Sequence, residues 1–144
     1  MASQYSISQS DLTPDLIPAE LYDQLTDWDA DGSADVDVDD VIVAAENEFN
    51  SFVGGMFSEA ANIALAKPHV LAVVVYALHA RREQNSDYNI PESVTLRYRK
   101  ALDWAADQGA KLLSAEGSVT PPGGGGVEYD ADDSNFGMSS TDLL

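Results

Sequence analysis

The stretch "KPHVLAVVVYALHARR", residues 67–82, decides the fold. Pro68 suits the first turn of a helix, where the missing N–H of proline has no helical partner to lose. We expect that helix to run from Pro68 to about residue 85. Residues 70–78 are apolar on nearly every face of such a helix, which is typical of a buried element. This segment is therefore predicted to be the central helix of the domain.

A second helix is predicted over residues 38–53, because apolar residues recur there with the spacing of one helix face. They are Val38, Val41, Ile42, Ala45, Phe49, Phe52 and Val53. Asp37 is placed to cap the first turn, and Gly54 with Gly55 supplies the stop. Residues 56–67 have no strong period and are interpreted as a connection.

Two further helices are predicted to open at prolines. Pro91 begins a helix that reaches about residue 112, and Pro18 begins a shorter one after a turn capped by Ser10. With no pattern that favours a sheet, the sequence predicts an all-α fold. We expect a small helical bundle of about four helices.

The helical domain is expected to span residues 1–116 and to be followed by a different kind of segment. Residues 117–144 contain two adjacent prolines and four adjacent glycines, a composition that cannot form a packed core alone. We predict an extended C-terminal tail that becomes ordered only on a partner. Its candidate partner-binding residues are Tyr129, Phe136 and Met138.

Charge is strongly segregated along the 144 residues, whose net charge is −18. Residues 1–66 carry 14 Asp or Glu and no Lys or Arg, whereas all seven Lys and Arg lie in residues 67–116. An acid-biased proteome explains such a charge without any partner. A polarised subunit that contacts further copies explains it as well. In that reading the partner-binding cations are Arg81, Arg82, Arg97, Arg99 and Lys100.

The same composition excludes several functions. The chain has no cysteine, so disulfides, thiolate metal sites and a cysteine nucleophile are absent. Its seven Lys and Arg are too few for a broad surface that binds nucleic acid. The longest apolar run has nine residues, whereas a helix needs about 20 to cross a bilayer. We therefore expect a soluble protein without a signal peptide or membrane contact.

The stretch "DWDADGSADVDVDD", residues 27–40, contains seven aspartates and matches the first nine positions of a calcium loop. The positions that would supply ligands are Asp27, Asp29, Asp31, Ser33 and Asp35. The second half departs from the motif, because Val38 stands where a bidentate Glu completes the calcium shell. A turn that feeds the helix at residue 38 accounts for the same residues, and the two readings are compatible. If this loop binds a metal, we expect a structural Ca²⁺ or Mg²⁺ ion.

Catalysis is poorly supported, and we expect no enzyme and no cofactor. His69 and His79 lie ten residues apart on one predicted helix, without a convergent third ligand. The acids lie in polar sequence, which does not separate the pKa values of an acid and a base pair. The four glycines at 123–126 lack the Lys and Ser or Thr of a phosphate-binding loop.

Residues 5–117 resemble the Mu-like prophage family of small head-to-tail connector proteins. The resemblance is carried by "QLTDWDADG" at 24–32, "YALHARR" at 76–82 and "RYRKALDWA" at 97–105, in this order and spacing. The chain departs from the family at residues 54–67, where a Pro-Leu pair usually follows an aromatic residue. Its glycine-rich extension is also unusual.

The resemblance implies a structural adaptor in the virion neck, assembled in the host cytoplasm. Similar proteins form a ring of twelve subunits between the portal protein and a tail terminator or neck stopper protein. Double-stranded DNA passes through such a ring without specific binding during genome packaging and ejection. The C-terminal segment of these proteins commonly reaches the portal or a neighbouring subunit, which here corresponds to the tail.

Two other classes remain open from the residues alone. A calcium-binding helical module would use the aspartates of residues 27–35. An acidic inhibitor that mimics DNA would carry its acids on exposed helix faces, whereas here the acids concentrate in loops and termini.

Overall fold

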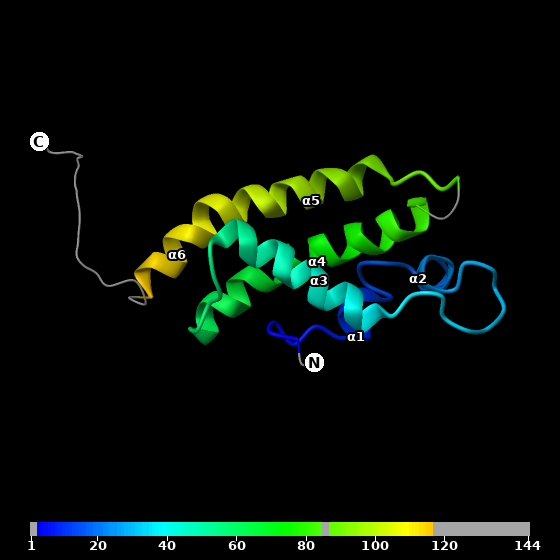
Figure 1. The fold of residues 1–144 in the computed structure, drawn as a ribbon, viewed down its shortest axis with the longest axis horizontal. Helices are drawn as coiled ribbons and strands as arrows, with labels where there is room; N and C mark the ends of the chain where they lie inside the picture. The colour runs from blue at the N-terminus through cyan, green and yellow to red at the C-terminus, as the bar shows by residue number, and fades with distance from the viewer. Residues whose placement is uncertain (1–2, 85–86, 117–144) are drawn as a thin grey trace, which may run out of the picture. The chain divides into compact units, whose positions relative to one another are not determined.

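A computed structural model describes residues 3–84 and 87–116 of the chain, and it confirms the all-α fold. Every regular element in these residues is helical (Figure 1). The elements are α1 (Gln9–Leu12), α2 (Ala19–Thr26), α3 (Val38–Val53), α4 (Ala60–Gln84), α5 (Glu92–Trp104), the π-helical segment η1 (Ala105–Gly109) and α6 (Ala110–Ala115). Residues 1–110 form one compact unit, and residues 111–144 are assigned to a second. The predicted tail anchors Tyr129, Phe136 and Met138 lie outside the described residues.

Helix α3 has the ends that the sequence predicts. The Asp37 side chain accepts hydrogen bonds from the backbone N–H groups of Asp39 and Asp40, which have no partner inside the helix. Gly54 ends the helix in the left-handed conformation, with φ of 96°. Both ends follow from local chemistry, because a cap needs only the few residues around it.

Helix α4 begins earlier than the sequence predicts. It starts at Ala60, so the predicted connection over 56–67 is wrong from Ala60 onward, and Pro68 lies inside the helix. Residues 60–66 contain four alanines, and alanine has the highest helix propensity. The apolar residues of this segment do not mark one buried helix face, because Ala60, Ala61 and Leu65 are exposed. The short turn near the N-terminus also shifts, because Ser8 and not Ser10 caps α1.

The length and composition of α4 also meet the criterion for a helix that could cross a membrane, with a mean hydropathy of 1.6 over 18 residues. The core helix of a soluble domain meets the same criterion. Lys67 lies in α4 and pairs with Asp11 through an Nζ–Oδ2 distance of 3.5 Å. We treat α4 as a core helix that is only partly covered, because a third of that 18-residue window is buried.

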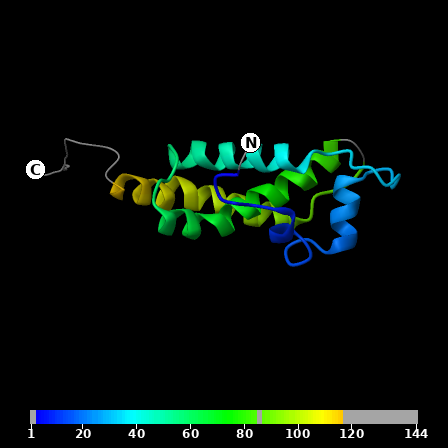
Figure 2. The same ribbon diagram turned by 90° about the horizontal axis from the view of Figure 1, so that it is seen from below.

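The other two long helices, α3 and α5, pack against α4. Figure 1 shows α3 crossing α4 and α5 returning antiparallel to it, and Figure 2 shows α2 running across the direction of α3. Val70, Val73, Val74 and Leu78 of α4 are completely buried. This burial confirms that residues 70–78 form the centre of the domain.

Aromatic rings from four parts of the chain stack through the core. Trp104 of α5 lies between Phe49 of α3 and His69 of α4, with centroid distances of 6.2 and 4.3 Å. Tyr5 meets Phe49 edge-on, with the ring centroids 6.0 Å apart. Gly109 lets η1 approach α3, because a Cβ there would lie 3.1 Å from Val53 Cγ2. The rings and the glycine fix how α5 and η1 pack on α3.

Candidate functional site

The acidic loop between α2 and α3 folds around its own carboxylates. Asp27 accepts hydrogen bonds from the N–H groups of Asp31 and Gly32, at 3.3 and 2.9 Å. Asp35 accepts one from the Trp28 N–H at 2.7 Å, and its own N–H donates to the Thr26 carbonyl at 2.6 Å. The loop is therefore closed on itself immediately before α3 begins.

Three of the five predicted metal ligands come together in this loop. Carboxylate oxygens of Asp27, Asp29 and Asp35 lie within 4.8 Å of one another. The Asp31 carboxylate is not part of this group, and it accepts a hydrogen bond from the Ser33 N–H at 2.8 Å. The clustered oxygens suit a hard cation such as Ca²⁺ or Mg²⁺, which would still take several waters.

The pKa directions within the loop reflect this crowding. Desolvation, followed by the hydrogen bond to Asp27 and the charges of Asp31 and Asp35, raises the pKa of Asp29. Desolvation acts in the same sense on Asp27, but the N–H groups of Gly32 and Asp31 help to outweigh it, and the pKa of Asp27 is lowered. A bound cation would relieve the repulsion that Asp29 experiences.

The five predicted partner-binding cations lie on two helices, α4 and α5. Arg82, in the last turn of α4, donates to the Trp28 carbonyl at 3.1 Å, and Arg81 precedes it in that turn. Arg97, Arg99 and Lys100 are exposed on α5 and have no hydrogen bond or ion pair to any residue in the described ranges. Two residues along a helix correspond to about 200°, so Arg97 and Arg99 point to different sides.

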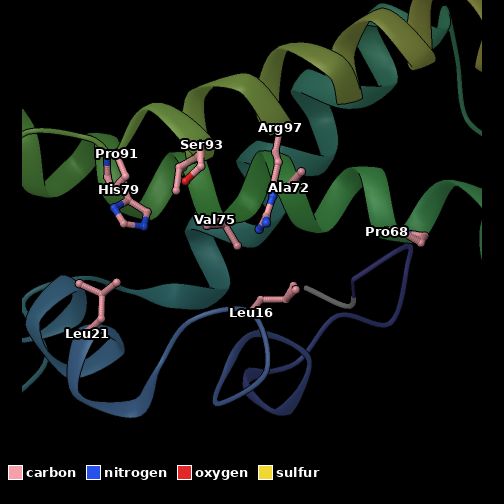
Figure 3. A pocket seen from close by; sticks show the side chains of 10 residues that line it. Leu16, Leu21, Pro68, Ala72, Val75, His79, Pro91, Ser93 and Arg97 are labelled. Carbon is pink, nitrogen blue, oxygen red and sulfur yellow. The ribbon is translucent and has the colours of Figure 1, made fainter.

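Arg97 lies at an apolar groove that sequence reasoning missed. The groove has a volume of about 290 Å³ and lies between α4, the start of α5 and the segment around α2. Its lining includes Leu16, Leu21, Val75 and Val94. Figure 3 shows Arg97 reaching from α5 across α4 toward Leu16. The groove is therefore lined mainly by apolar side chains, and Arg97 adds a positive charge to its lining.

His79 lies in the wall of the same groove and is 1% exposed. Its Nδ1 is 2.6 Å from the Tyr88 hydroxyl, and burial lowers the pKa of its imidazole. The neutral ring carries its proton on Nε2 when the Tyr88 hydroxyl donates to Nδ1. His69, the other histidine, stacks on Trp104. Both rings therefore pack against aromatic side chains.

A second feature missed from sequence is a polar clamp on the N-terminal segment. Glu46 of α3 is 4% exposed and accepts hydrogen bonds from the Gln4 and Tyr5 N–H groups, at 3.3 and 3.2 Å, and from the Ser3 hydroxyl. The Tyr5 hydroxyl donates to Asn50 at 2.7 Å. The signal was present, because Glu46 and Asn50 occupy the face of α3 that carries its buried apolar residues.

No family model, curated protein or solved structure matches the chain.

Proposed function

We propose that the protein is a structural adaptor in the neck of a tailed bacteriophage. In this role it forms a ring, twelve subunits by the resemblance, between the portal protein and the next neck or tail protein. It has no catalytic role, and DNA passes through the ring without specific binding. The tail, residues 117–144, would contact the portal or a neighbouring subunit.

The observation that supports this proposal best is the segregation of unpaired charge. Arg97, Arg99 and Lys100 have no acidic partner among the described residues, although acids greatly outnumber bases in the chain. Exposed cations of this kind can pair with the acidic surface of another copy or of a neighbouring neck protein. An assembling subunit therefore accounts for charges that a monomer leaves unpaired.

The acidic loop is consistent with the same role. Repeated around a ring, an acidic surface repels phosphate, so DNA can slide past it without adhering. The adaptor needs no specific nucleic-acid contact.

Immunogold electron microscopy of intact phage particles tests the proposal. One antibody is raised against the folded helices and a second against residues 119–144. Label confined to the neck between capsid and tail is the expected result, and selective loss of the tail-directed label would place that segment against a partner. Particles with exposed or partly dissociated necks that carry no label would overturn the proposal.

A second candidate function, binding of a divalent cation by the acidic loop, is favoured by the convergence of Asp27, Asp29 and Asp35. The cation would staple the loop ahead of α3. Because the twelfth-position Glu is missing, we expect a weak site that needs about 1 mM Ca²⁺ or more.

Thermal unfolding measured with and without Ca²⁺ tests this second candidate. Addition of about 10 mM Ca²⁺ should raise Tm, by about 4–8 °C per kcal/mol of binding free energy. The double variant D27N/D29N should lose the increase. D39N/D40N removes the same charge from outside the cluster and should keep it. Equal behaviour of the two variants would point to general screening of acids and against a site.

A further inference from the structure

Four of the five large apolar side chains that the described residues expose fall into two groups. Leu16 is 42% exposed and lines the groove, and Leu65 is 57% exposed. Leu65 does not line the groove, but it lies seven residues before Ala72 on α4, so both share one face of the helix. The face of α4 that lines the groove therefore carries a further exposed apolar side chain toward its N-terminal end.

The second group forms an apolar tip where α3 turns into α4. Phe52 at the end of α3 is 45% exposed, and Met56 in the following turn is 64% exposed. We call this pair the turn tip. Exposed apolar side chains that lie close together mark an interaction site more often than isolated ones do.

Charge and size favour a match between these two surfaces. The turn tip lies in the part of the chain without Lys or Arg, and Glu48 and Glu59 flank it in sequence. The groove presents Arg97, which has no ion pair among the described residues. A groove of about 290 Å³ is at the lower limit of small-molecule pockets, so it suits one or two side chains better than a cofactor.

We propose that the groove receives the turn tip of a second copy of this chain. Phe52 and Met56 would then lie against Leu16, Val75 and Leu65 of the neighbouring copy. Arg97 would face the acids that flank the tip. The contact joins two different surfaces, so it is heterologous and can propagate from copy to copy until a ring closes. The inference rests on the proposed ring and names the surfaces that build it.

Site-directed cross-linking of the full-length chain tests the contact. The chain has no cysteine, so single cysteines can be introduced without background. The variants M56C and L16C are coexpressed, one with an affinity tag, and treated with a short bis-maleimide. We expect a covalent heterodimer between M56C and L16C. The link must join two chains, because each chain carries one cysteine.

A matched control uses Leu96, which is 47% exposed on α5 and does not line the groove. The M56C and L96C pair should link far less than the M56C and L16C pair. Equal yields, or a dominant M56C homodimer, would overturn the inference.

Assembly itself supplies the second readout. F52D should weaken self-association by about 30-fold or more, the effect of losing a hot-spot aromatic residue. L96D places the same charge at a similarly exposed position and should leave assembly unchanged, with circular dichroism confirming that both variants fold. Rings that form from F52D and show no link between M56C and L16C would refute the contact while leaving the adaptor role intact. Absence of the protein from the virion neck would instead refute the adaptor role, whatever the cross-links show.

Discussion

Glu46 shows how one buried carboxylate holds a distant segment. Its carboxylate accepts hydrogen bonds from the Gln4 and Tyr5 N–H groups and from the Ser3 hydroxyl. These hydrogen bonds compensate for the cost of burying the carboxylate. In the variant E46A these donors lose their acceptor, and we expect the free energy of unfolding to fall by about 2–3 kcal/mol. Chemical denaturation measures the change.

The matched control for Glu46 is its exposed neighbour on α3, Asn47. N47A should change the free energy of unfolding by no more than about 0.5 kcal/mol. If both alanine variants have similar stabilities, the polar clamp contributes little to the folded state.

Because His79 is buried, we expect the protein to lose stability in mild acid. Its burial lowers the pKa of the imidazole below the ordinary value of 6.5, so the unfolded chain takes up a proton more readily than the folded one. The free energy of unfolding should therefore decline as the pH falls below about 6.5 and continue to decline until the folded pKa is passed. Denaturation of the wild type and H79Q between about pH 7.5 and 5.5 measures this, and the decline should be shallower in H79Q. Parallel curves for the two proteins would contradict it.

At the scale of the element, Gly54 determines how α3 ends. Its φ of 96° disfavours most residues that carry a Cβ, and a Cβ placed there would meet nothing within 4 Å. The cost of G54A is therefore conformational, and we expect about 1 kcal/mol of destabilisation. G54N should recover part of the loss, because Asn tolerates this conformation. Thermal unfolding distinguishes the two, and equal Tm values for G54A and the wild type would refute the role of the left-handed end.

The helix ends also show which parts of the fold could be predicted from sequence. Both ends of α3 were predictable, because Asp37 and Gly54 act on the residues beside them. The start of α4 was not, because Pro68 has the same local appearance in a first turn and inside a helix. Proline inside a helix costs about 3 kcal/mol, and here the burial of Ala66 and Val70 on either side opposes that cost.

The candidate site also has one part that could be predicted from sequence and other parts that could not. The aspartates of the loop were predictable as a turn before α3, since their spacing is a local signal. The groove could not be predicted, because it combines residues as far apart as Leu16, Val75 and Val94. Glu46 could have been identified as a polar residue on an apolar helix face, but its partners lie more than 40 residues away.

At the scale of the whole molecule, the net charge of −18 makes copies repel one another, so assembly needs specific attraction. Arg99 and Lys100 are exposed cations that have no partner in the described residues. We expect R99E/K100E to weaken ring formation. Mass photometry at increasing salt should show the difference from wild type shrinking between about 0.05 and 0.5 M, because exposed pairs are screened. Unchanged assembly of this variant at low salt would argue against a role for these cations.

The N-terminal clamp also affects the order in which the domain folds. The hydrogen bond from Ser3 to Glu46 spans 43 residues, whereas α3, α4 and α5 contact their neighbours in sequence. Closing a long loop costs entropy before its contacts form, so the hairpins of the long helices should form first. The N-terminal segment would then attach to a helix pair that is already in place. Local opening of the native state should begin at the same segment, well before the core around Phe49 is exposed.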